Sequence, residues 1–145
     1  MNTKKIAVNR TLGFSIVEVI IVLGIIVILA SGAVLAYKIV GEYKTYKVAY
    51  QIAADLEYAK GLAFERGNAT IIFTSNSYVI KSNNQTILTK ILPEGIMLNC
   101  TLSVITIKRN KLPEGAGSIC VSGFGKKYKV IYNHINGRIK VDYGC

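Results

Sequence analysis

The sequence is poor in the residues that most enzymes use for catalysis. Its 145 residues include one histidine, His134, which lies beside a predicted hairpin turn. A catalytic triad needs a base next to its nucleophile, and no such pair is apparent elsewhere in the chain. These absences favour a protein that is not an enzyme.

Cysteines are also few: Cys100, Cys120 and Cys145 make an odd set. They lack the paired, close spacing of a zinc site, and the one histidine is not near them in sequence. The sequence therefore predicts no metal and no cofactor. Outside the membrane such a set allows one disulfide and one free thiol, but sequence does not decide which two cysteines pair.

Proline and acidic residues are missing from the start of the chain. Neither of the two prolines lies between Phe14 and Ile91, so nothing in that stretch forces a helix to end. The first 13 residues contain no acidic side chain and three basic ones, Lys4, Lys5 and Arg10. Positive charge beside an apolar helix holds that end in the cytoplasm.

A long apolar run follows this basic peptide. From Phe14 to Ala36 it has about 23 residues, enough to cross a bilayer as a helix. Glu18 is its one acidic residue, and a charged side chain in such a helix costs about 2.5–3.5 kcal/mol on insertion scales. The alternatives are a cleaved secretory signal, with a small-residue site at residues 30–33, and an uncleaved signal anchor. Neither accounts for Glu18.

The stretch GFSIVE at residues 13–18, between the basic leader and the apolar run, resembles the class III signal of type IV pilins and pseudopilins. Residues 59–73, 92–96 and 136–139 are similar to segments of the H-type minor pseudopilins and related minor type IV pilins. The resemblance implies cleavage between Gly13 and Phe14 and N-methylation of Phe14. It also implies that Glu18 pairs with the N-terminal amine of a neighbouring subunit.

The same resemblance implies partners and a location. A prepilin peptidase would process and methylate the chain, other pilins or pseudopilins would pack against it, and an inner-membrane platform protein would take part in assembly. The chain would first be a single-pass membrane protein, with its N-terminus in the cytoplasm and its head outside. It would then join a pilus or pseudopilus filament at the cell surface.

The functional hypothesis is therefore a structural subunit, a minor pilin or pseudopilin of a type IV pilus or type II secretion-like filament. Two alternatives remain open. One is a DNA-capturing minor pilin of a competence pilus, and the other is an unrelated single-pass anchored protein. The sequence does not distinguish secretion, twitching and competence machines.

The helical pattern continues beyond the apolar run. Gly67-Asn68 is typical of a helix C-terminus, so one helix is predicted over residues 14–66. Apolar residues recur at helical spacing on one face of its second half: Val48, Ile52, Leu56, Ala59 and Ala63. The tyrosines that follow the apolar run are interpreted as an interfacial belt and helix packing, with a binding or conduction role as the alternative: Tyr37, Tyr43, Tyr46 and Tyr50.

The rest of the chain has the pattern of strands joined by turns. Strands are predicted over residues 69–74, 77–82, 86–91, 96–108 (one or two), 118–122, 127–133 and 138–143, with a loop over 110–117. Asn136-Gly137 is a strong hairpin signal. The predicted fold is α+β and pilin-like: a long N-terminal α-helix, apolar and transmembrane in its first half, packed on a C-terminal antiparallel β-sheet.

Four segments follow from these patterns. Residues 1–13 are a cleaved basic leader, and residues 14–36 are a transmembrane and filament-core helix. Residues 37–66 are its amphipathic continuation, and residues 67–145 form a β-rich globular head.

The net charge of +10 favours attraction to polyanions such as DNA. Phe124 and Tyr128 lie near basic residues and could stack on bases. The hypothesis places two basic clusters together at one exposed end of the sheet, with ordinary solvated loops as the alternative. The glycine-rich segment 123–127 lacks the spacing of a phosphate-binding loop and is predicted to be a β-turn. The clusters are Lys108, Arg109 and Lys111, and Lys126, Lys127 and Lys129.

Overall fold

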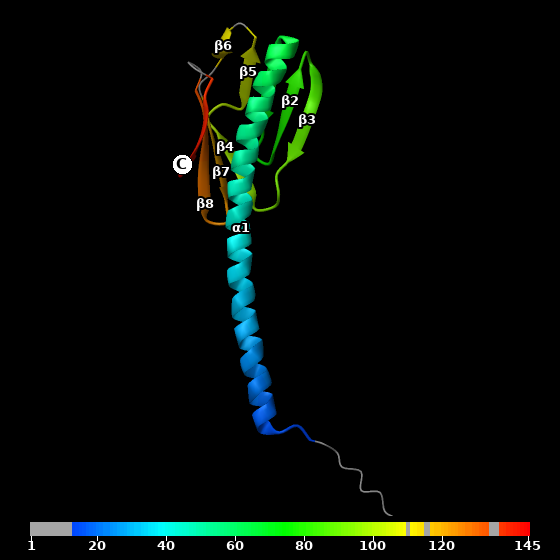
Figure 1. Ribbon diagram of the computed structural model, residues 1–145, viewed down its shortest axis with the longest axis vertical. Coiled ribbons are helices and arrows are strands. Elements are labelled where there is room, and N and C mark those ends of the chain that lie inside the picture. Colours follow the sequence, from blue (N-terminus) through cyan, green and yellow to red (C-terminus); the bar gives the residue numbers. More distant parts are fainter. Residues whose placement is uncertain (1–12, 110, 115–116, 134–136) are drawn as a thin grey trace, which may run out of the picture. The chain divides into compact units, whose positions relative to one another are not determined.

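The computed structural model describes residues 13–109, 111–114, 117–133 and 137–145. The chain divides between Tyr37 and Lys38 into two compact units. Figure 1 shows one long helix and the strands that lie beside its later part. We call the part up to Tyr37 unit 1 and the part from Lys38 to Cys145 unit 2. Several residues for which the sequence makes predictions lie outside the described residues: Lys4, Lys5, Arg10, His134 and Asn136.

One helix, α1 (Ile16–Arg66), accounts for all the helical structure of the described residues. At its start the Ser15 hydroxyl accepts a hydrogen bond from the Val17 N–H at 3.4 Å, the position of an N-cap. At its end Gly67, with φ +93°, donates its N–H to the Ala63 carbonyl at 2.9 Å. The predicted helix is confirmed, with a start two residues later because Ser15 is the cap.

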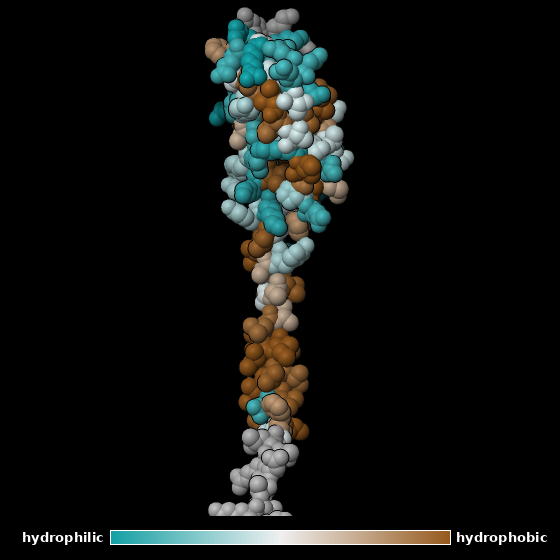
Figure 2. All heavy atoms as spheres, turned by 90° about the vertical axis from the view of Figure 1, so that its right-hand side faces the viewer, coloured by the Kyte–Doolittle hydropathy of each residue, from teal (hydrophilic) through white to brown (hydrophobic). Residues whose placement is uncertain are grey.

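Unit 1 consists mainly of the apolar first part of α1. Every residue from Gly13 to Tyr37 is exposed, and Figure 2 shows the side chains along this part of α1 in the brown of apolar residues. Among the described residues, α1 is the one helix long and apolar enough to cross a membrane. Its length and composition are therefore compatible with a transmembrane segment.

Unit 2 contains two antiparallel sheets. Sheet A has the strand order β3-β2-β1-β5-β6, and sheet B has the order β4-β7-β8-β9. The strands of sheet A are β1 (Asn68–Phe73), β2 (Ser77–Ser82), β3 (Gln85–Ile91), β5 (Val104–Lys108) and β6 (Lys111–Glu114). The strands of sheet B are β4 (Ile96–Cys100), β7 (Gly117–Gly123), β8 (Lys126–Tyr132) and β9 (Ile139–Tyr143).

The predicted α+β fold is confirmed, because the later part of α1 packs on antiparallel sheets. Two details differ from the prediction. The strands form two sheets rather than one, since β4 pairs with β7 and not with a strand adjacent to it in sequence. The predicted loop over residues 110–117 contains β6, which tolerates Pro113 because it is an edge strand.

Both sheets share one hydrophobic core with α1. Strand residues alternate in burial: β1 buries Ala69, Ile71 and Phe73, and β7 buries Ile119 and Val121. The intervening residues face away from α1, so each sheet has an inner face on the core and an outer face toward solvent. The five helix residues predicted to face the core are all buried: Val48, Ile52, Leu56, Ala59 and Ala63.

Candidate assembly and ligand sites

The predicted processing and assembly residues lie at the start of α1. Gly13 and Phe14 precede the helix and are exposed, Phe14 by 80%. Exposed, irregular backbone is the preferred substrate of proteolysis. Glu18 lies in the first helical turn, where unpaired backbone N–H groups and the helix dipole stabilise a carboxylate.

The same stretch has the pattern of a capping box, Ser15-x-x-Glu18. Ser15 is the N-cap, which makes Glu18 the third residue of the helix. This pattern is visible in the sequence and was not used to predict where the helix begins. Glu18 therefore has a local reason to occur at this position, in addition to the pairing between subunits that the pilin resemblance implies.

The turn between β7 and β8 packs closely on α1. Phe124 and Gly125 have φ values of +50° and +78°, which confirms the predicted β-turn. A Cβ added to Gly41 of α1 would lie 2.4 Å from the Phe124 ring, and one added to Gly95 would lie 2.9 Å from it. The ring fills a slot between two glycines and is not the free stacking surface that the sequence suggested.

Hydrogen bonds hold α1 to both sheets. Thr45 Oγ1 lies 3.1 Å from the carbonyl oxygen of Gly123 in β7. Asp55 accepts a hydrogen bond from the Tyr78 hydroxyl and pairs with Lys90 Nζ at 2.8 Å. Burial, and then the bond to Asp55, raises the pKa of Tyr78 well above its ordinary value. Tyr78 therefore remains protonated and acts as the donor.

The two basic clusters lie far apart. Arg109 donates hydrogen bonds from Nε and Nη2 to the carbonyls of Phe64 and Glu65, both at 2.5 Å, at the C-terminal end of α1. Lys126 lies 3.6 Å from the carboxylate of Glu42. Glu42 and Phe64 are 22 residues apart in α1, about 33 Å along the helix axis. The hypothesis of a joint site at one end of the sheet is wrong.

Individual residues of these clusters also have different surroundings. Lys108 is half-buried, and the side chain of Lys111 lies outside what the structure describes. Lys126 lies over the ring of Tyr143 at 5.7 Å, and the Glu42 carboxylate is the main cause of its raised pKa. Lys127 and Lys129 instead line a surface cavity on sheet B.

The three cysteines divide into one disulfide and one free thiol. Cys120 of β7 is bonded to Cys145, with a Cα–Cα distance of 6.0 Å. Cys100 of β4 is free and half-buried, and burial raises the pKa of its thiol. A raised pKa lowers the fraction of reactive thiolate. Of the three possible pairings of these cysteines, the structure contains the one between Cys120 and Cys145, which leaves Cys100 unpaired.

Tyr46 is the centre of an aromatic cluster. Its ring centroid lies 6.4 Å from that of Tyr43, 4.5 Å from Tyr50 and 5.8 Å from Tyr128. Tyr128 in turn lies 5.5 Å from Tyr143. These distances are typical of interacting aromatic pairs. The contact with β8 confirms that Tyr46 takes part in helix packing, although the ring is still 40% exposed.

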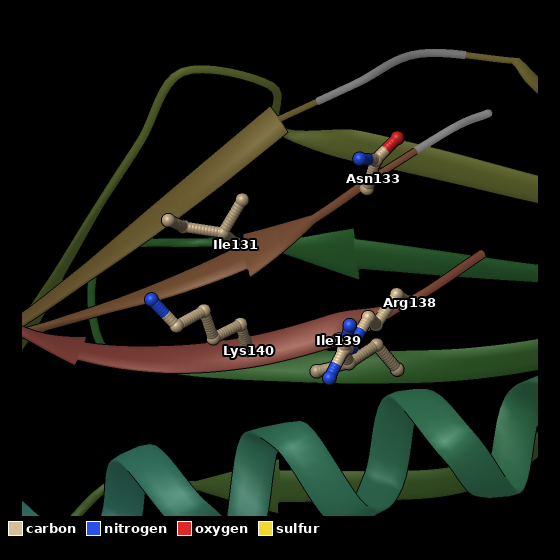
Figure 3. Close-up of a pocket in the computed structure, with 5 residues that line it drawn as sticks. All are labelled: Ile131, Asn133, Arg138, Ile139 and Lys140. Carbon is tan, nitrogen blue, oxygen red and sulfur yellow. The ribbon is translucent and has the colours of Figure 1, made fainter. Parts of the chain in front are cut away.

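Surface cavities occur on both ends of sheet B. One of about 440 Å³ lies beside the end of β8 and the start of β9, where Arg138 precedes β9 and Lys140 lies within it (Figure 3). The loop that joins these strands is partly outside the described residues. A second cavity, of about 310 Å³, is lined by β4, β7, β8 and the C-terminus and includes Lys127 and Lys129.

Within the described residues, no three His, Cys, Asp or Glu side chains lie close enough together to hold a metal ion. Comparison of the chain with protein-family profiles, curated protein sequences and solved structures gives no significant match. The fold, the start of α1 and the surfaces described above are therefore the basis for assigning a function.

Proposed function

We propose that this chain is a structural subunit, a minor pilin or pseudopilin, of a type IV pilus or a related secretion filament. The observation that carries the proposal is the apolar part of α1, which is exposed from Ile16 to Tyr37 and begins with a carboxylate at Glu18. Contiguous apolar surface of this extent marks a membrane or protein interaction site. A bilayer would cover it before assembly, and the same part of neighbouring subunits would cover it in the filament.

Glu18 supplies the specificity of this packing. A carboxylate in an apolar environment is strongly disfavoured without a partner of opposite charge. Cleavage after Gly13 creates an amine at Phe14, and the amine of a neighbouring subunit can neutralise Glu18. Docking in one register satisfies both charges, whereas a shift along the helix leaves both unpaired.

The proposal includes specific partners and two locations. A prepilin peptidase cleaves and methylates the chain, other pilins pack on α1, and a membrane platform protein assists assembly. Before assembly the chain spans the membrane, with its N-terminus in the cytoplasm and unit 2 outside. After assembly it is part of a filament at the cell surface.

Mass spectrometry of the mature chain tests the processing step. We expect an N-methylated N-terminal Phe14 in cells that contain a prepilin peptidase. Gly13→Leu should block cleavage without disturbing the fold, because no atom lies within 4 Å of a Cβ at that position. A mature chain that still begins with Met1 would contradict the proposal.

Incorporation into filaments tests the role of Glu18. Glu18→Gln keeps the shape of the side chain and removes its charge, so we expect normal cleavage and membrane insertion. The amount of subunit in sheared filaments should fall by about tenfold or more, since loss of one partner of a buried ion pair costs several kcal/mol. Glu65→Gln makes the same chemical change at an exposed site of unit 2 and should have no effect. Equal incorporation of both variants would refute the pairing.

A further inference from the structure

The outer face of sheet B carries the cavity that contains Lys127 and Lys129. Val121 and Val130 face the core. By strand alternation Cys120 and Lys129, which are opposite one another in the β7–β8 pair, face outward. Lys127 is two residues before Lys129 and lies on the same face. The cavity therefore lies on the side of the sheet away from α1.

The C-terminal residues close one side of this cavity. Gly144, with φ +90°, turns the chain after β9 and donates its N–H to the Lys127 carbonyl at 2.8 Å. The next residue, Cys145, is bonded to Cys120. Both cysteines line the cavity of about 310 Å³. The disulfide is thus a covalent wall beside the two lysines.

The positive charge of the two lysines is not balanced by acidic side chains in the cavity. No Asp or Glu is among the described residues that line it. Asp142 is opposite Lys129 in the β8–β9 pair, but its Oδ1 is paired with Lys140 Nζ at 2.7 Å. Neither Lys127 nor Lys129 has an ion-pair partner in the part of the chain that the structure describes. Two ammonium groups are therefore available to an anion.

Uncharged polar groups complete the lining. The hydroxyls of Thr101 and Ser118 lie 3.2 Å apart, and Asn99 also lines the cavity. Lysine binds phosphate as a point charge, and hydroxyl groups donate hydrogen bonds to phosphate oxygens. The described residues that line the cavity supply both kinds of group, lysines and hydroxyls.

We propose that this cavity binds a phosphate group, with Lys127 and Lys129 supplying the charge and the Cys120–Cys145 disulfide holding the site closed. Free phosphate and the phosphodiester of a nucleic acid present the same oxygens to it. The proposal is independent of filament assembly, because every residue that it uses lies in unit 2.

Ligand titration of the full-length chain in an uncharged detergent tests the proposal. Inorganic phosphate and a thymidine oligonucleotide are added in separate titrations at about pH 8, where lysine is protonated, and binding is followed by the shift in unfolding temperature. Sodium chloride at matched ionic strength is the reference, since general screening affects all surface charges. We expect at least one phosphate ligand to raise the unfolding temperature more than the reference, and their relative affinities identify the source.

Two paired substitutions locate the site. Lys127→Gln with Lys129→Gln should weaken phosphate binding by about tenfold, because each exposed ammonium group contributes a few-fold. Lys44→Gln with Lys47→Gln makes the same change in charge on the exposed side of α1 and should leave binding unchanged. An equal loss in both double variants, a chloride effect as large as that of phosphate, or equally tight binding of polyglutamate would overturn the proposal.

The disulfide provides a second readout at the same site. Cys145→Ser keeps both lysines and removes the wall, so we expect several-fold weaker phosphate binding in chains that circular dichroism shows to be folded. Cys100→Ser leaves the disulfide intact and should bind as the parent chain does. Unchanged binding by folded Cys145→Ser would show that the anion does not occupy this cavity.

Discussion

At the scale of single residues, Gly41 is the position where α1 tolerates no side chain. Alanine normally stabilises a helix by up to about 1 kcal/mol relative to glycine, but a Cβ at Gly41 would lie 2.4 Å from the Phe124 ring. We expect Gly41→Ala to lower the free energy of unfolding by about 1–3 kcal/mol, the usual cost of overpacking.

Gly61 is the matched control, because nothing lies within 4 Å of its added Cβ. Gly61→Ala should therefore raise stability by up to about 1 kcal/mol. Urea unfolding of both variants, followed by circular dichroism, makes the comparison. If both substitutions stabilise the chain, the Phe124 ring is not fixed in its slot.

Two buried tyrosines make a second contrast at this scale. Tyr78 donates its hydroxyl proton to Asp55, whereas the Tyr132 hydroxyl is buried without a partner in the described part of the chain. We expect Tyr78→Phe to destabilise the fold by about 1–2 kcal/mol, and Tyr132→Phe to be neutral or stabilising, since it removes an unsatisfied polar group. Denaturant midpoints measure the difference. A Tyr132→Phe variant less stable than Tyr78→Phe would contradict the assignment.

At the scale of secondary-structure elements, periodicity predicts α1 and most strands correctly. Val48 to Ala63 follow a helical repeat, and Gly67 ends the helix as a C-cap does. The division into two sheets could not be predicted, because alternation reports which face of a strand is buried and not which strand lies beside it. The sequence did not predict β6, because this strand has four residues and one of them, Pro113, lowers its strand propensity.

The Cys120–Cys145 bond fixes the C-terminal end of sheet B. A cross-link that closes a loop of this size stabilises a fold by about 2–4 kcal/mol, and its residues are 25 positions apart. We expect a reductant to lower the free energy of unfolding by that amount, measured with urea in detergent. The Cys100→Ser variant should show the same loss, because its free thiol is not part of the bond. Unaltered stability after verified reduction would contradict a structural role for the disulfide.

At the scale of the whole molecule, the candidate sites were only partly predictable. The proposed processing and assembly residues could be predicted because Gly13, Phe14 and Glu18 lie within six residues of one another, where the apolar run begins. The basic clusters were misplaced because sequence gives no distance between segments: Arg109 bonds to the end of α1, while Lys126 pairs with Glu42 near its middle. The burial of Val130 in β8 shows by strand alternation that Lys129 faces away from the core.

Alkaline pH should destabilise unit 2. Burial raises the pKa of Tyr132 to about 12. Burial and the hydrogen bond to Asp55 together raise the pKa of Tyr78 above that of Tyr132. Above about pH 10 the unfolded chain loses these protons and the folded chain retains them, so the free energy of unfolding falls as pH rises.

Urea unfolding between about pH 8 and pH 11 measures this slope on both sides of the ordinary tyrosine pKa. A double variant, Tyr78→Phe with Tyr132→Phe, should flatten it, and Tyr58→Phe, at an exposed position, should not. An identical slope in the double variant would show that other groups govern the alkaline transition.

The attachments of α1 within unit 2 also have a mechanical consequence. Thr45 is bound to Gly123, Asp55 to Tyr78, Lys60 to the Gly137 carbonyl, and the last turn to Arg109. They are distributed along the helix and alternate between segments of the two sheets. Tension applied at Lys38 along the axis of this segment is therefore a shear that strains all the attachments at once, instead of peeling them apart one after another. Unit 2 should resist pulling from this end far better than pulling that lifts β9 from the edge of sheet B.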